Sequence, residues 1–407
     1  MTGWPHVVPE LAGRLPEMQA LRRDLHAHPE LSYQEFRTSN LVAARLQACG
    51  IRVRRGLAGT GVVGSLQRGT SARSIGLRAD MDALPLQEAN RFEHASRHVG
   101  VMHACGHDGH TAMLLGAAEH LAQHGRFDGT VHFIFQPAEE QGAGAQRMLD
   151  EGLFDHHPCD EIFALHNWPG MAVGHFGVRS GSMMAGTAGL EITVTGCPAH
   201  AAMPHAGVDA LMVACHIAIG AQMLITRERN PLDAAVLTIT QLHAGETMNV
   251  VAAKAALRGT LRFFDPTVLD RLEEGLCRVS TLTAEAHRAS AHCAVQRNYP
   301  PLVNHAGPTC FAASTMAALV GADRVNTDVS PTMAAEDFAY LLRARPGCFA
   351  FIGNGLADAR LPDHGDGPCL LHSDSYDFND ELLPLGASYF VRLVETRLAS
   401  SPGETTP

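Results

Sequence analysis

The sequence contains a single lysine, Lys254, so almost all of its 31 basic residues are arginine. The 42 acidic residues give a formal net charge of −11, and no cluster of basic residues occurs, which argues against a nucleic acid partner. Hydrophobic residues make up 46% of the chain and charged residues 18%, so a disordered or coiled-coil chain is excluded. The length of 407 residues predicts two or three domains.

Long apolar runs and a secretory signal are also missing. We identify no run approaching the ~20 residues of a membrane span, and residues 1–18 lack a basic end followed by an apolar block. We therefore expect a cytoplasmic protein that has no membrane partner. The ten cysteines include no CxxC pair, which argues against a disulfide framework.

Histidine, by contrast, is abundant, with 24 residues. A count this high is typical of a histidine-rich metal buffer, but no histidine-rich tract exists. Cys105 stands out among the cysteines because its neighbours are polar and rich in histidine. Since lysine is almost absent, we expect many of the histidines without a task in binding or catalysis to lie on the surface.

The first half of the chain alternates between strand-like and helical segments. Apolar runs at 74–82, 130–140 and 160–169 end in polar residues, and residues 107–125 have helical periodicity. This pattern predicts an α/β fold with a mixed sheet, helices on both faces and a ligand site at the carboxyl ends of the strands.

The pattern changes at about residue 188. The order strand, helix, strand, strand, helix, strand follows, which is that of a ferredoxin-like α+β unit. The α/β pattern resumes at about residue 300. We therefore predict a discontinuous α/β domain, residues 1–187 and 300–407, with a small domain inserted at residues 188–299.

Five side chains beside strand ends or helix starts are candidate metal ligands: Cys105, His107, Glu140, His166 and His372. Their thiolate, imidazole and carboxylate groups suit Zn, Co, Ni or Mn better than Ca or Mg. A catalytic zinc typically takes three protein ligands and keeps a position for water. If one of the five bridges, they make six contacts, three for each of two ions, which favours a dinuclear hydrolytic site.

Glu139, next to Glu140, is the candidate general base. It would take a proton from water and pass it to the leaving nitrogen. Taken alone, a Cys-x-His pair more often combines a packed cysteine with a surface histidine, and Glu-Glu pairs are usually solvated. Their joint occurrence at strand ends favours the functional interpretation.

Nine segments in order over some 360 residues resemble those of one family: RRDLHAHPELSYQE (22–35), LRADMDALP (77–85), MHACGHDGH (102–110), FQPAEE (135–140), LHNWP (165–169), AHAAMPHAGVDA (199–210), MNVVAAKAALRGTLR (248–262), AEDFAYLL (335–342) and LHSDSYDFND (371–380). The chain resembles the dinuclear-metal aminoacylase and carboxypeptidase family, in its amidohydrolase branch. That branch contains hippurate hydrolases, indole-acetyl-amino-acid hydrolases and N-acetyl-diaminopimelate deacetylases.

The resemblance implies a metal-binding catalytic domain and an inserted lid, commonly with a homodimer formed through the lids. Cys105 would bridge two divalent ions, Glu140 and His372 would complete one site, and His107 and His166 the other. Glu139 matches the general base.

Asp82 matches the aspartate of a His-x-Asp motif whose histidine is absent here. We assign it the orientation of a ligand; a strand-end cap is the alternative. In the lid, His200 matches a histidine that reaches the catalytic cleft, often across the dimer, and would stabilise the oxyanion.

Asn249 and Arg262 match positions that hold the substrate carboxylate; for Arg262, a strand-surface charge is the alternative. Cys197-Pro198 and Ala210 depart from the usual lid pattern and put the substrate preference in doubt. His205 is expected to be structural, and the resemblance gives no direct role to His26 or His28.

These inferences predict a metal-dependent amidohydrolase that cleaves N-acyl amino acids into a carboxylic acid and a free amino acid. A dipeptidase or carboxypeptidase would use the same site. A cysteine hydrolase with Cys105 as nucleophile and His107 as base would leave Glu139, Glu140, His166 and His372 without a task. A non-catalytic binding protein would lack a ligand or the base, and none is missing.

Overall fold

The chain forms two compact units in the computed structural model, which describes residues 4, 6–356 and 363–400. The larger unit contains the chain up to Met183, Val303–Ser330, and the chain from Asp337 onward. The smaller unit contains Met184–Leu302 and Pro331–Glu336. The predicted insert, residues 188–299, falls inside the smaller unit, whereas the addition of Pro331–Glu336 was not foreseen.

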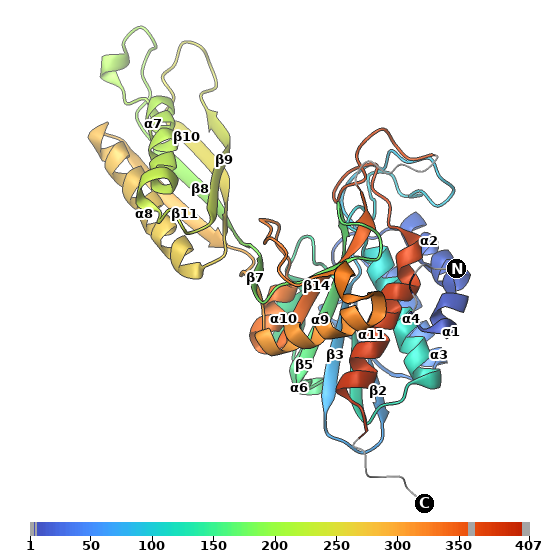
Figure 1. Ribbon diagram of the computed structural model, residues 1–407. Coiled ribbons are helices and arrows are strands. Elements are labelled where there is room, and N and C mark those ends of the chain that lie inside the picture. The colour runs from blue at the N-terminus through green and yellow to red at the C-terminus, as the bar shows by residue number, and fades with distance from the viewer. Residues whose placement is uncertain (1–3, 5, 357–362, 401–407) are drawn as a thin grey trace, which may run out of the picture. The chain divides into compact units, whose positions relative to one another are not determined.

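The larger unit contains one mixed sheet. Its strands are β1 (Arg52–Leu57), β2 (Gly61–Arg68), β3 (Ser74–Asp80), β4 (Gly129–Gln136), β5 (Glu161–Pro169), β6 (Phe176–Gly177), β13 (Val325–Asn326) and β14 (Gly347–Gly355). They lie in the order β1-β2-β4-β3-β5-β14-β6-β13. Figure 1 labels β2, β3, β5 and β14 of this sheet. The central strands β4, β3, β5 and β14 are parallel, and β1, β2 and β6 make antiparallel pairs. The carboxyl ends of β4, β3, β5 and β14 therefore share one edge of the sheet.

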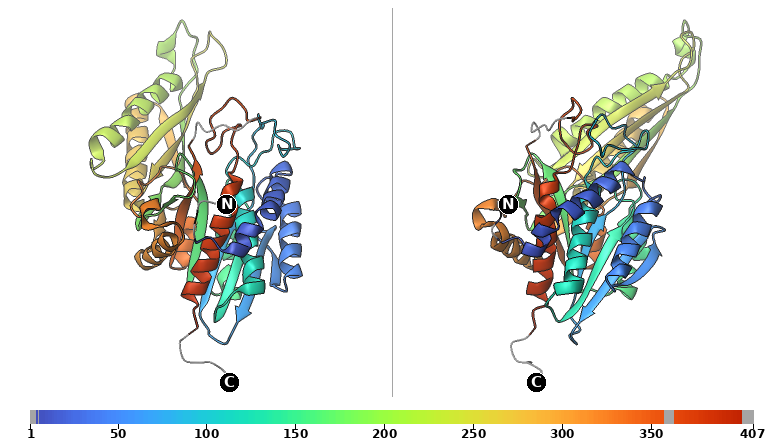
Figure 2. Two further views of the ribbon diagram at one scale, coloured as in Figure 1. Left: turned by 45° about the vertical axis from the view of Figure 1, so that its right-hand side comes forward. Right: turned by 90° about the vertical axis from the view of Figure 1, so that its right-hand side faces the viewer.

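Helices cover both faces of this sheet (Figure 2). They are α1 (Pro9–Gly13), α2 (Leu15–Ala27), α3 (Phe36–Ala48), α4 (His107–His124), α5 (Gly144–Asp150), α6 (Leu153–His156), α9 (Ala306–Val320), α10 (Phe338–Ala344) and α11 (Leu383–Arg397). Cys348 and Ala350 of β14 belong to the core shared with α4 and α11. Phe349 points to the other face and meets Phe338 of α10, with ring centroids 5.8 Å apart. The central strands are apolar almost throughout because both faces are covered.

The smaller unit is a ferredoxin-like α+β domain, as the strand and helix order predicts. It contains β8 (Gly186–Thr195), α7 (Ala210–Met223), β9 (Ala235–Ala244), β10 (Lys254–Phe263), α8 (Pro266–Ala286) and β11 (Ser290–Arg297). The antiparallel sheet has the order β11-β8-β10-β9. Ile192 of β8, Ile217 of α7 and Leu276 of α8 share its core.

One helix of the smaller unit, which contains α7, corrects the expectation that no apolar segment approaches the length of a membrane span. With the π-helical turn at Leu224–Glu228 it forms a helix of 19 residues, Ala210–Glu228, with a hydropathy of 1.5. By length and composition it is the one helix among the described residues that is apolar enough to cross a membrane. The face formed by Val213, Ile217 and Leu224 is buried in the core of the smaller unit, whereas Leu211, Met212, Ile219 and Met223 of the same helix are exposed.

Candidate metal centre

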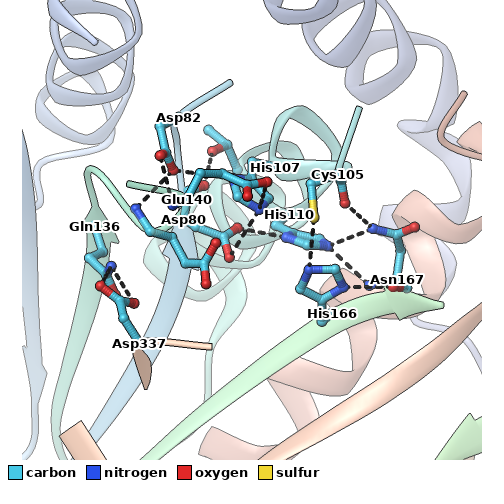
Figure 3. A network of polar contacts seen from close by, with 12 residues as sticks. Asp80, Asp82, Cys105, His107, His110, Gln136, Glu140, His166, Asn167 and Asp337 are labelled. Atoms are coloured by element: carbon cyan, nitrogen blue, oxygen red, sulfur yellow. Dashed lines mark hydrogen bonds and ion pairs between the residues drawn. The ribbon is translucent and has the colours of Figure 1, made fainter. Parts of the chain in front are cut away.

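The carboxyl edge of the parallel strands gathers the predicted ligands of the larger unit; Figure 3 shows Cys105, His107, Glu140 and His166 among them. Glu140 follows β4, and His166 lies in the second half of β5. Cys105 and His107 lie at the start of α4. His372 comes from the loop before α11, and its N–H donates to the Ala104 carbonyl at 2.8 Å, which ties this loop to the Cys105 segment.

The ligand atoms of the predicted residues form overlapping clusters, in each of which they all lie within 4.8 Å of one another. One contains Cys105, Glu140 and His372, a second contains His107, Glu139 and Glu140, and a third contains His107 and His166 with Asp80 and His110. His166 joins them, because its Nε2 lies 3.5 Å from Cys105 Sγ. The structure therefore brings all five predicted ligands and the predicted base together. His372 is the exposed member, with 55% of its side chain accessible.

Two buried atoms in these clusters, His107 Nε2 and Glu140 Oε1, lack a hydrogen-bond partner among the described residues. They face each other at 4.0 Å, and Glu140 Oε1 lies 3.3 Å from His372 Nε2. Buried polar atoms are rarely left unpaired, and a bound ion is one reason for the exceptions. The sulfur, nitrogen and oxygen donors fit two divalent transition-metal ions.

Hydrogen bonds also aim the imidazoles at the cluster. His166 Nδ1 donates to the Asn167 carbonyl at 2.6 Å, and His107 Nδ1 lies 3.3 Å from Asp82 Oδ1. Each contact holds the proton on Nδ1 and leaves Nε2 free for a metal, which is how ligating histidines are usually oriented. The burial of His166 lowers its pKa well below the usual range, in agreement with a neutral imidazole.

The protonation of Cys105 and His107 depends on their surroundings. Burial, with the nearby charges of Glu140 and Glu139, raises the pKa of the Cys105 thiol well above its usual value. Burial lowers the pKa of His107, but the carboxylates of Asp80 and Asp82 outweigh it and raise that pKa to about 10. Divalent cations would reverse this balance, so their binding would release protons from the cluster.

Asp82 organises the loop of the two glutamates. Its Oδ1 accepts from the Glu139 N–H at 3.1 Å and its Oδ2 from the Glu140 N–H at 3.0 Å. Ser32 Oγ donates to Oδ2 at 2.7 Å. Together with its contact to His107, these bonds link the predicted base and two predicted ligands through one carboxylate.

Four residues that the sequence reasoning missed form a hydrogen-bonded chain next to the predicted ligands: Asp80, His110, Asn167 and Tyr376. Asp80 Oδ1 accepts from His110 Nδ1 at 2.6 Å, and the Asn167 N–H donates to His110 Nε2 at 3.0 Å. Tyr376 OH donates to Asn167 Oδ1 at 2.7 Å. His107 and His110 are three residues apart in a predicted helix, and this spacing could have indicated His110, since it puts both side chains on one face.

The histidines without a predicted task are not all on the surface. Six of them are buried: His26, His103, His110, His120, His132 and His157. His26 is completely buried and lies 2.8 Å from Asp108 and 3.1 Å from Glu88, measured to their carboxylate oxygens. His28 is partly exposed and bonds to the Asp24 carbonyl, within its own helix turn.

The remaining predicted residues belong to the smaller unit. His200 and Asn249 are exposed neighbours, because His200 bridges to Val250 and the Ala201 N–H donates to the Asn249 carbonyl at 2.9 Å. They adjoin the end of the sheet where Lys254 pairs with Thr195.

Arg262 lies at the opposite end of the same sheet. It is half-buried near the far end of β10, where it pairs with Thr187. Eight residues of strand separate it from Lys254, about 26 Å at 3.3 Å per residue. One smaller unit therefore does not bring Arg262 together with His200 and Asn249. His205 is exposed in a short 3₁₀ turn.

Residues 76–396 match the model for Peptidase family M20/M25/M40. The chain belongs to this family. The resemblance inferred from the nine motifs is thereby confirmed, and so is the mixed α/β fold.

Several characterised or named proteins are similar over most of the chain. It is 35% identical to IAA-amino acid hydrolase ILR1-like 5 of Arabidopsis thaliana, covering 94% of this chain and 87% of that protein. It is 36% identical to N-acetyl-L-cysteine deacetylase of Bacillus subtilis (96% and 90%) and 34% identical to hippurate hydrolase of Campylobacter jejuni (95% and 98%). The M20 member is thus a hydrolase that acts on amide bonds.

A solved structure supports the metal centre. The YXEP protein of Bacillus subtilis, titled a dinuclear metal binding peptidase from the M20 family, is 30% identical. The similarity covers 96% of this chain and 100% of that one, with a TM-score of 0.81. Together with the clusters around Glu140, it fits a centre for two divalent ions.

Proposed function

We propose that this chain hydrolyses N-acyl amino acids, releasing a carboxylic acid and a free amino acid, with Glu139 as the general base. The observation that carries the proposal is the position of Glu139 beside Glu140 and His107, with its ligand atom within 4.8 Å of theirs. The named relatives act on indole-acetyl, acetyl-cysteine and hippurate-type compounds, and they suggest aromatic and acetyl acyl groups as the classes to test.

The ligands would be divided as the resemblance implies. Cys105 would bridge the two ions, Glu140 and His372 would hold one, and His107 and His166 the other. The bound ions would polarise the acyl carbonyl and make water more acidic. Zinc, manganese, cobalt and nickel all suit the donor set.

The residues of the chain would manage the proton. Glu139 would remove one proton from water as the water oxygen adds to the acyl carbon. It would then deliver that proton to the amide nitrogen as the carbon–nitrogen bond breaks, which balances the reaction. Because Glu139 is 6% exposed, its contact with bulk water would be limited while it holds this proton.

Residues of the smaller units of two molecules would complete the site. His200 would donate a hydrogen bond to the developing oxyanion, and Asn249 and Arg262 would bind the substrate carboxylate. Because His200 and Asn249 lie at the opposite end of the sheet from Arg262, we propose that one molecule supplies the pair and the other supplies the arginine, in a homodimer formed through the smaller units.

The cysteines bear on two further parts of the proposal, the cytoplasmic location and the exclusion of Cys105 as the nucleophile. A cytoplasmic location would keep Cys105 reduced, and all ten cysteines are free thiols. The Cys105 nucleophile alternative is disfavoured, because burial raises the pKa of its thiol whereas catalytic cysteines need a lowered one.

The experiment is metal analysis of the purified protein coupled to a substrate panel. Benzoyl-glycine, N-acetyl and indole-acetyl amino acids would be compared with dipeptides before chelation, after chelation and after adding each metal back. We expect hydrolysis of at least one N-acyl class, lost on chelation and restored by metal. Preference for dipeptides would favour the peptidase alternative, and activity that survives exhaustive chelation would favour the cysteine nucleophile.

A further inference from the structure

The segment Glu30–Glu35, between α2 and α3, reaches the loop that carries Glu139. It belongs to the motif at residues 22–35, to which the proposed reaction gives no task. Ser32 Oγ donates to Asp82, and Tyr33 OH donates to the Gly142 carbonyl at 2.5 Å. Glu35 makes the most direct contact with the loop.

Glu35 is completely buried, and both of its carboxylate oxygens are hydrogen-bonded. Its Oε1 accepts from the Ala138 N–H at 2.9 Å and from the Tyr33 N–H at 3.0 Å. Thr60 Oγ1 donates to Oε2 at 2.5 Å. The side chain is therefore fixed between its own segment, the start of β2 and the residue before Glu139.

Ala138 has an unusual backbone conformation, with φ at +55°. A non-glycine residue in the left-handed region is uncommon and persists where its surroundings determine it. The hydrogen bond from its N–H to Glu35 is such a constraint. It acts on the residue whose ψ angle sets the direction of the Glu139 peptide.

Three successive N–H groups of this loop end on two carboxylates. Glu35 accepts from Ala138, and Asp82 accepts from Glu139 and Glu140. Asp82 also contacts His107, so its replacement would disturb a proposed ligand as well. Glu35 binds the loop at Ala138, which is not a proposed ligand, so its effect on the base can be measured separately.

We propose that Glu35 is a positioning residue that holds Glu139 in place for proton transfer. The inference rests on the proposed role of Glu139 as the general base. Without the Glu35 oxygen, the Ala138 N–H loses its partner and the left-handed turn loses one of its constraints, while the bond from the Gly144 N–H to the Ala138 carbonyl remains. A displacement of about 1 Å at a reacting group can lower the rate by about a hundredfold. Substrate binding and metal binding use other residues, so the effect belongs in kcat.

The test compares three variants of the full-length, metal-loaded protein. Glu35→Met keeps the length and removes both oxygens, and Glu35→Gln keeps the Oε1 acceptor. Glu30→Met is the matched control, because Glu30 belongs to the same segment and its carboxylate accepts from two N–H groups at the start of α3, those of Arg37 and Thr38, each at 2.8 Å.

The first readout is amide hydrogen exchange of residues 138–142, which does not depend on activity. We expect about tenfold or faster exchange in Glu35→Met and near wild-type exchange in Glu35→Gln and Glu30→Met. The second is steady-state kinetics on the best substrate of the panel, with metal content measured alongside. We expect kcat to fall about tenfold or more in Glu35→Met alone, with KM and metal content close to wild type.

Unchanged exchange over residues 138–142 in Glu35→Met would overturn the proposal, and so would equal losses of kcat in Glu35→Met and Glu30→Met. If Glu35→Met does not fold, Glu35→Asp replaces it with the same expectations, because the shorter side chain withdraws the oxygens from Ala138. Failure of the proposed function is distinguishable, since wild type would then be inactive on the whole panel while the exchange readout still tests the Glu35 contact.

Discussion

The side-chain amide of Asn167 donates to the backbone carbonyl of Cys105, with 2.6 Å between Nδ2 and O. The oxygen of the same amide accepts from Tyr376 OH at 2.7 Å. Asn167 follows His166 directly, and Tyr376 lies four residues after His372. One hydrogen-bonded pair therefore connects the three chain segments that carry Cys105, His166 and His372.

We predict that Tyr376→Phe lowers metal affinity by about tenfold or more, the usual effect of removing a residue that orients metal ligands. The substitution leaves Asn167 Oδ1 buried without its donor. Affinity would be measured by competition with a chelator of known strength. Tyr389→Phe is the control, because Tyr389 is equally buried but its hydroxyl has no hydrogen-bond partner among the described residues. Equal affinities of the two variants would contradict the prediction.

Substitution should distinguish the roles of the adjacent residues Glu139 and Glu140. Glu139→Gln is expected to retain both metals and to lose about a thousandfold in kcat, because the amide cannot carry the proton. Glu140→Gln is expected to bind less metal, because a neutral amide is a poorer ligand for both clusters. Elemental analysis with kinetics on the same samples distinguishes them. Full activity of Glu139→Gln with both metals bound would rule out its role as the base.

The strand ends could be predicted from sequence because the pattern is local. The runs before Glu140 and around His166 are apolar on both faces, as central strands covered by helices must be, and polar residues follow them. Parallel neighbours then place their carboxyl ends at one edge. That is why Glu140 and His166, which come from different strands, were expected to meet.

The supporting residues could not be predicted in this way. The contact of Asn167 with Cys105 depends on how closely β5 approaches the start of α4, and this distance is a property of tertiary packing. The separation of Arg262 from Asn249 could have been predicted from the sequence, because a predicted strand lies between them and its length sets the distance. Motif matching alone placed both on the same substrate group, since it carries no information about the direction of the strand.

The buried pair His132 and His157 should make stability depend on pH. Ser65 Oγ lies 2.9 Å from His132 Nδ1 and 3.2 Å from His157 Nδ1. Burial lowers the pKa of both histidines to about 4. In the unfolded chain they bind protons near pH 6.5. The unfolded state therefore takes up more protons between pH 6.5 and 4, so their contribution is complete above pH 6.5 and is lost as the pH falls toward 4.

The effect is best measured as a difference between variants. His132→Gln should flatten the pH dependence of the free energy of unfolding between pH 7 and 4, by about 3 kcal/mol at most. Glu35, whose pKa is raised by burial to about 7, acts in the opposite direction over this range, so the wild-type curve alone does not isolate the effect. Urea titrations at several pH values test this, with the exposed His243→Gln as control. Parallel curves for wild type and His132→Gln would contradict the assignment.

The turn before α4 leaves no room for a side chain at Gly106. Its φ is +91°, and a Cβ there would lie 2.2 Å from Asn167 Nδ2 and 2.4 Å from Tyr376 OH. Asn167 Nδ2 donates to the Cys105 carbonyl and Tyr376 OH donates to Asn167 Oδ1, so a shift of Asn167 would release Cys105. We therefore predict that Gly106→Ala lowers metal content and activity together.

Gly100→Ala is the control that separates backbone strain from a steric clash of the new side chain. Gly100 also has a positive φ, +74°, but its Cβ would meet nothing within 4 Å. It should cost about 1–2 kcal/mol of stability and leave metal binding intact. Metal content measured on folded samples of both variants decides, and full metal loading of Gly106→Ala would show that the Asn167–Tyr376 pair does not hold the Cys105 segment.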